Sequence, residues 1–120
     1  MSARAHTQVR PYRSSAPSRN VQIMIVGIVS IQLHIPAAQS LKDKRRVVQA
    51  VVARMHERHR VSVAETALHD AHQRAEIGVA AVGKSESEVE RLLERLRDEI
   101  EIRGDALVTR WEPQLVEDLG

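Results

Sequence analysis

The sequence predicts an α+β sandwich in which two helices cover one face of a four-stranded antiparallel sheet. Segments with a two-residue hydrophobic period and segments with a helical period alternate in the order strand, helix, strand, strand, helix, strand. A chain of 120 residues has the length of one domain, and it contains no cysteine that could form disulfides or thiolate–metal sites. Two strand–helix–strand halves with right-handed crossovers give the ferredoxin-like strand order 4-1-3-2.

Residues 1–23 differ in composition from the rest of the chain. They carry four arginines, no acidic residue and no hydrophobic period. Such a segment buries too little apolar surface to fold, so we predict a disordered basic tail, or an extension upstream of a true start at Met24. Without these arginines, 14 of the 18 basic residues remain against 16 acidic ones, so the net charge of +2 does not describe the domain.

The apolar stretch from Ile23 to Leu33 follows these arginines, as in a secretory signal. Gln32 and His34 interrupt it, and cleavage would remove a strand that the fold needs. It is also shorter than the roughly 20 apolar residues that cross a bilayer. We therefore expect a cytoplasmic protein without a membrane partner.

The first half of the domain contains a strand, a helix and a second strand. Alternation from Ile25 to His34 predicts the first strand, which Pro36 ends. Ser40 and Asp43 form a capping-box-like start for a helix that runs to about His59. The apolar positions of this helix are Leu41, Val48, Val51, Val52 and Met55, and the second strand contains Val61 and Val63.

The second half follows a polar loop at 68–73. The third strand carries Ala75, Ile77, Val79 and Ala81 on one side. A capping box at Ser85 and Glu88 opens the second helix, whose apolar face is Val89, Leu92, Leu93, Leu96 and Ile100. We predict that Gly104 ends this helix, that Leu107, Thr109 and Trp111 form the last strand, and that Pro113 closes it. The predicted domain is 24–113, followed by a short tail at 114–120.

The first helix begins with a basic run that carries the main functional prediction. Lys42, Lys44, Arg45 and Arg46 stand where a helix intrinsically prefers anions. Together with the free amide groups of the first turn, they would bind phosphate, and Arg74 is a weaker candidate. The alternative is a solvated face that keeps the helix soluble.

The residues that could support catalysis or bind a metal are few. His69, Asp70 and His72 are weak metal candidates in one loop, and His34 could join them. The alternative is a solvated polar turn. The chain has no cysteine nucleophile, no Gly-x-Ser-x-Gly turn and no phosphate loop. We expect no catalytic activity, no cofactor and no metal, with a metal-dependent hydrolase at this loop as a third hypothesis.

The sheet face opposite the helices is predicted to be open. It carries Ala64, Gly78, Ala80 and Val82, and Val26 and Ile28 share it. The chain has no phenylalanine, and Trp111 is predicted to point inward beside the second helix, so RNA recognition by base stacking on this sheet is excluded. Self-association as a homodimer is the leading interpretation of this face, and a bare antiparallel face is the alternative.

Several of these motifs, in order, resemble the YlxP-like family of bacterial domains of unknown function. They are Val26 to Pro36, Ser40 to Arg46, Val61 to Glu65, Gln73 to Ala75, Gly78 to Ala80, and Trp111 with Glu112. The resemblance covers about Met24 to Pro113 and implies a ferredoxin-like fold, with no established activity or catalytic residues. The loop around His69 and His72 departs from the family form, where an acidic residue and an aromatic are frequent, which weakens the metal hypothesis.

Members of the family are often encoded beside translation-initiation and ribosome-maturation factors, which implies an RNA or ribosome partner. The first functional hypothesis is therefore an RNA- or ribosome-associated accessory protein that binds phosphates through its first helix. The alternative is a homo-oligomeric structural or small-molecule-sensing module that uses the open sheet face.

Overall fold

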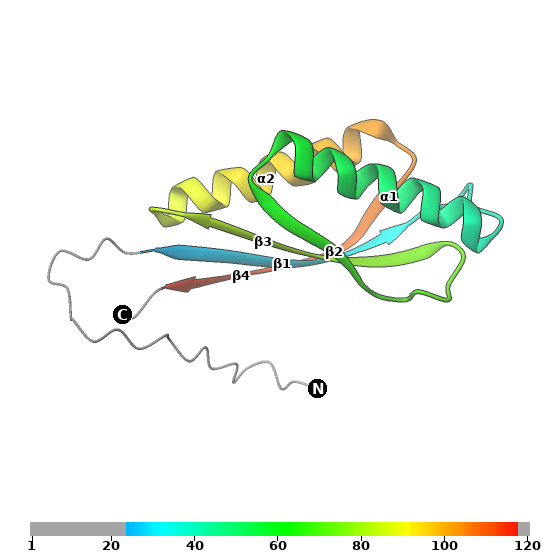
Figure 1. Ribbon diagram of the computed structural model, residues 1–120, viewed down its shortest axis with the longest axis horizontal. Coiled ribbons are helices and arrows are strands. Elements are labelled where there is room, and N and C mark those ends of the chain that lie inside the picture. Colours follow the sequence, from blue (N-terminus) through cyan, green and yellow to red (C-terminus); the bar gives the residue numbers. More distant parts are fainter. Residues whose placement is uncertain (1–23, 118–120) are drawn as a thin grey trace, which may run out of the picture.

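The computed structural model describes residues 24–117 and contains the six elements in the predicted order. They are β1 (Ile25–His34), α1 (Leu41–Arg58), β2 (Val61–Ala67), β3 (Arg74–Gly83), α2 (Glu86–Arg103) and β4 (Leu107–Glu117). The strand order is β2-β3-β1-β4, which is the predicted order read from the other edge. Both helices lie on one face of the sheet (Figure 1). The predicted tail at 1–23, and residues 118–120, lie outside the described residues.

The core lies between the helices and the inward face of the two central strands. β1 pairs antiparallel with β3, so that Val29 lies opposite Val79 and Ile31 opposite Ile77, and all four side chains are buried. The predicted alternation is confirmed along both strands. No helix in the described part of the chain has the length and apolar content needed to cross a membrane.

Both helices start and stop where the sequence predicts. The Ser40 side chain accepts a hydrogen bond from the Asp43 amide at the start of α1, and Ser85 accepts one from Glu88 at the start of α2. The carboxylates of Asp43 and Glu88 in turn accept from the backbone amides of Gln39 and Lys84, the residues before each serine, in a variant of the capping box. α2 ends at Gly104, whose φ of 81° is a left-handed conformation that glycine adopts without strain.

The last strand is longer than predicted. β4 continues past Pro113 to Glu117, so the prediction that Pro113 closes the strand is wrong, and residues 114–117 of the predicted tail belong to the sheet. β4 is an edge strand, where a proline fits if its nitrogen faces away from the neighbouring strand. Leu115, beyond the proline, packs against the core.

Trp111 points to the helix side of β4, as predicted. It packs against the core, and the Arg97 guanidinium of α2 lies 5.2 Å from the centre of its ring. This distance permits a cation–π contact. The only tryptophan of the chain therefore joins α2 to the sheet and is not a stacking platform on the open face.

Candidate functional site

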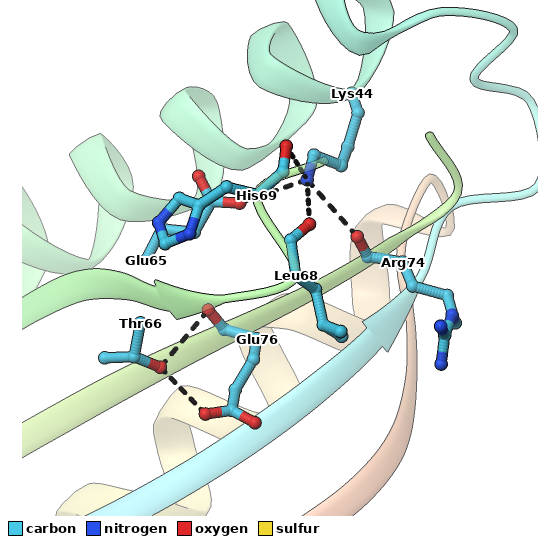
Figure 2. Close-up of polar contacts among 7 residues, drawn as sticks. All are labelled: Lys44, Glu65, Thr66, Leu68, His69, Arg74 and Glu76. Atoms are coloured by element: carbon cyan, nitrogen blue, oxygen red, sulfur yellow. Dashed lines mark hydrogen bonds and ion pairs between the residues drawn. The ribbon is translucent and has the colours of Figure 1, made fainter. Parts of the chain in front are cut away.

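The basic run at the start of α1 is divided by the structure into one buried and three exposed cations. Lys44 is completely buried. Its ammonium donates hydrogen bonds to the carboxylate of Glu65 at 3.1 Å, to the carbonyl of Leu68 at 2.8 Å and to the carbonyl of Arg74 at 3.3 Å (Figure 2). The prediction that Lys44 contacts phosphate therefore needs correction, because no part of its side chain reaches solvent.

The position of Lys44 on α1 explains its burial. Residue 44 lies one turn before Val48 and two turns before Val51, on the face that packs against β2 and β3. The loop between these strands passes beneath it and offers carbonyl oxygens, including that of His69 at 3.5 Å. Leu68 has a φ of 64°, an uncommon conformation for a side-chain-bearing residue. Lys44 therefore ties this loop to α1.

The other three cations stay accessible. Lys42, Arg45 and Arg46 are exposed, on the sides of α1 that face away from its buried stripe. Within residues 24–117, none of the three lies within ion-pair distance of a carboxylate. They therefore form a solvent-facing cluster, which we call the α1 cluster.

The first turn of α1 offers less to an anion than the sequence suggests. The Asp43 amide is bound to the Ser40 hydroxyl, and the Asp43 carboxylate accepts the Gln39 amide at 3.0 Å. The Asp43 carboxylate already places a negative charge at the positive, N-terminal end of the helix dipole. Any phosphate contact would therefore depend on the side chains of the α1 cluster rather than on the helix terminus.

The two helices carry opposite net charges. α1 has six Lys and Arg residues against two acidic ones, whereas α2 has four Arg against seven acidic residues. They lie beside each other on the same face of the sheet (Figure 1). A polyanion would therefore be attracted to the α1 side of the molecule and repelled from the α2 side.

An open hollow of about 660 Å³ lies where β1 ends and β3 begins. Its charged or titratable lining residues are His34, Asp70, His72 and Arg74. His69, the remaining metal candidate, is not part of the lining. Within residues 24–117, no group of three or more His, Cys, Asp or Glu side chains is arranged to hold a metal ion.

The side chain of Arg74 does not join the α1 cluster. Its backbone carbonyl accepts from Lys44, while its exposed side chain points away from that ammonium (Figure 2). It lies opposite His34 in the β1–β3 ladder. The structure therefore places the weaker phosphate candidate at the hollow.

The residues predicted for an interface share the open sheet face. Ala80 lies opposite Ile28 and Val82 opposite Val26, and Ala64 lies opposite Gly78. Val82 is 58% exposed and Ile28 42% exposed, both large fractions for apolar side chains. The face becomes polar toward its other end, where Gln32 and Thr66 both bond to Glu76. The homodimer interface stays a prediction.

Sequence reasoning did not find the partners of the buried and half-buried charges. Glu65 holds Lys44, although the two residues are 21 positions apart. Glu99 of α2 contacts His59 at 2.6 Å and Arg58 at 3.3 Å, which joins the end of α1 to α2. No local pattern indicates such pairs, because the topology alone brings the residues together.

Comparison with known proteins agrees with the motifs and the fold. A family model described as "Protein of unknown function (DUF503)" matches residues 26–112, which is most of the chain. The chain belongs to the DUF503 family. This DUF503 chain is also 33% identical over 72 residues to the uncharacterized protein YlxP of Bacillus subtilis (strain 168), an alignment that covers 60% of this chain and 78% of that protein.

Among solved structures, the DUF503 chain is similar to the de novo designed protein Foldit4. The sequence identity is 18% and the TM-score is 0.42, with 81% of this chain and 98% of that chain covered. A similarity at this level adds nothing to the fold described above.

Proposed function

We propose that this DUF503 protein binds structured RNA, as a free RNA or as part of the ribosome, through contacts between the α1 cluster and backbone phosphates. The observation that carries the proposal is the exposure of Lys42, Arg45 and Arg46 without a carboxylate partner in residues 24–117. Lysine and arginine side chains that are not engaged within a protein are the usual ligands of nucleic-acid phosphates.

The charge difference between the helices supports the same proposal. A ligand that requires positive charge is directed to α1 and away from the acidic α2. The open sheet face supports no alternative RNA mode, since its described residues include no aromatic side chain and Trp111 packs inward. Recognition would therefore depend on phosphate positions and on the shape of the RNA rather than on base stacking.

Replacing Lys42, Arg45 and Arg46 together with alanine is expected to weaken RNA binding roughly tenfold or more. The slope of log affinity against log salt should also fall by about two to three, since each lost phosphate contact removes about 0.7–0.9. Binding of a fluorescent structured RNA, titrated at several salt concentrations, measures both quantities.

A matched control is available on the acidic side. Lys84, Arg91 and Arg95 are exposed and, among the described residues, outside the ion pairs. Their replacement with alanine removes the same residue types and the same net charge as the α1 variant. Equal loss of affinity in both triple variants, or no loss in the α1 variant, would contradict the proposal.

A second candidate function is self-association through the open sheet face, as a structural or ligand-sensing module. The exposed apolar pair of Ile28 and Val82 favours it. Ala80→Glu would place a charge beside Ile28 on this face and should dissociate such an assembly while leaving RNA binding intact. Analytical ultracentrifugation measures the assembly, and an unchanged sedimentation coefficient would argue against the interface.

A further inference from the structure

The two edges of the sheet differ in how well they are protected against pairing with another strand. β4 carries Pro113, a register shift at Thr109, and the charged pair of Arg110 and Glu112. Proline, bulges and charges are the features that keep an edge strand from adding a partner. β4 is therefore a protected edge.

β2, the opposite edge, has few of these features. Its seven residues, Val61–Ala67, contain no proline, and its register shift lies at the far end, beside Thr66. Its one charged residue, Glu65, is bound to Lys44. Within residues 24–117, β2 pairs only with β3. Its outer backbone groups therefore have no strand partner in the described chain.

The ladder shows which backbone groups of β2 face outward. Pro113 fits in β4 only if its nitrogen points away from β1, so its pair with Val29 is a non-hydrogen-bonded pair. Val29 then exchanges backbone hydrogen bonds with Val79 of β3. The backbone N–H and C=O of Val79 therefore point toward β1 and away from Val63 of β2. By this alternation, the amides and carbonyls of Val61, Val63 and Glu65 point to the outside.

We propose that the β2 strands of two copies of this chain pair antiparallel around a two-fold axis at Val63. The two four-stranded sheets would then form one continuous sheet. The outward groups of Val61, Val63 and Glu65 would exchange about six hydrogen bonds between the copies. The proposal concerns the strand edge and does not depend on RNA binding.

The sequence of β2 is self-complementary, which identifies a second copy of β2 as the strand that pairs with this edge. Around the proposed axis, Val63 lies opposite its own copy and Val61 opposite Glu65, both on the helix side. On the open face, Ser62 lies opposite Ala64. No like charges oppose each other, and the open-face side chains are small, so the reversed strand fits its own edge.

The same pairing is compatible with the charge on α1. α1 packs on β2 more than on any other strand, so the two α1 helices would become neighbours. The two-fold axis makes them antiparallel, so that the two α1 clusters lie at opposite ends of the helix pair instead of against each other. The dimer would carry both basic helices at its centre and both acidic helices outside.

Proline at position 63 tests the edge directly. Val63→Pro removes an outward N–H without removing a bond to β3, and Val63→Ala removes the same side chain but keeps the N–H. Sedimentation velocity of the full chain from micromolar to near-millimolar concentration should show a dimer for the wild type and Val63→Ala, and a monomer for Val63→Pro. Far-ultraviolet circular dichroism checks folding, and Val61→Pro at the start of the strand gives a second blocked edge.

Cysteine cross-linking tests the register, because the chain has no cysteine of its own. Ser62 and Ala64 would form a non-hydrogen-bonded pair across the axis, whose Cα separation of about 4.5 Å suits a disulfide. A mixture of Ser62→Cys and Ala64→Cys chains should form a heterodimeric disulfide under mild oxidation, in much higher yield than either chain alone.

The proposal is overturned by a monomeric wild type, or by a dimer that persists in both proline variants. It is also overturned by a dimer that Ala80→Glu dissociates and the proline variants do not, because that result places the contact on the open face. Equal cross-linking in the mixture and in the single-cysteine samples would exclude the register.

Discussion

Replacing Lys44 with methionine is expected to lower the free energy of unfolding by about 3 kcal/mol. Methionine keeps an apolar stem of similar length but cannot donate to Glu65 or to the carbonyls of Leu68 and Arg74. A half-buried carboxylate and buried carbonyl groups then lose their charged donor. Because the Glu65 side chain is 21% exposed, water relieves part of this loss, which places the effect at the lower end of the range for buried pairs. Urea unfolding followed by circular dichroism measures the change.

Arg45→Met is the matched control for this prediction. Arg45 is the next residue on α1, is exposed, and lies in no ion pair within the described part of the chain. Its replacement should change stability by no more than about 0.5 kcal/mol. A similar cost at positions 44 and 45 would show that the buried contacts of Lys44 contribute little.

A second substitution separates the ion pair from the other contacts of Lys44. Glu65→Gln removes the charge that Lys44→Met leaves without a partner. The double variant should be more stable than the sum of the two single effects predicts, since the two side chains act on each other directly. Strict additivity in this cycle would argue that Lys44 stabilises the loop through the carbonyls alone.

Gly27→Ala is the second substitution with a large expected effect, a loss of about 1–3 kcal/mol. Gly27 lies on the buried side of β1, beneath α2. A Cβ atom at this position would overlap Cγ1 of Val89 and come within 3.3 Å of Leu93. α2 would have to move off the sheet, and thermal or urea unfolding should detect the loss.

Two variants make this result specific to the contact with α2. Gly78→Ala places the same group on the open face, where the nearest atom is Cγ2 of the exposed Thr66 at 3.0 Å, and we expect a much smaller change there. Val89→Ala removes the overlapping Cγ1 methyl group, so it should be less harmful in a Gly27→Ala chain than in the wild type. Equal costs at positions 27 and 78 would contradict the explanation.

The elements of the fold could be predicted because their signals are local. Ser40 and Ser85 mark helix starts, Gly104 marks a helix end, and the alternation from Ala75 to Ala81 marks the buried face of β3. Pro113 was misread because the effect of proline depends on whether the strand is central or at an edge. β4 is an edge, and that position is a property of the sheet.

The candidate site was predicted only in part. The sequence places four cations at the start of α1, and three of them are exposed. It groups Lys44 with Arg45 and Arg46 in one basic run, although the spacing of Lys44 from Val48 and Val51 already places it on the apolar face of the helix. The difference arises because a rotation of about 100° per residue turns position 44 toward the sheet while its neighbours face solvent.

The amino-acid order by itself determined the element order, the strand order and the faces of both helices, because hydrophobic periods and capping residues act within a few positions of the chain. Only the tertiary structure decided which charges are available to a partner. Lys44 meets Glu65 and the 68–74 loop across the sandwich, and Glu99 meets His59 across the two helices. Such pairs depend on how distant segments are placed in space, so their consequences for binding and assembly follow from the packed molecule.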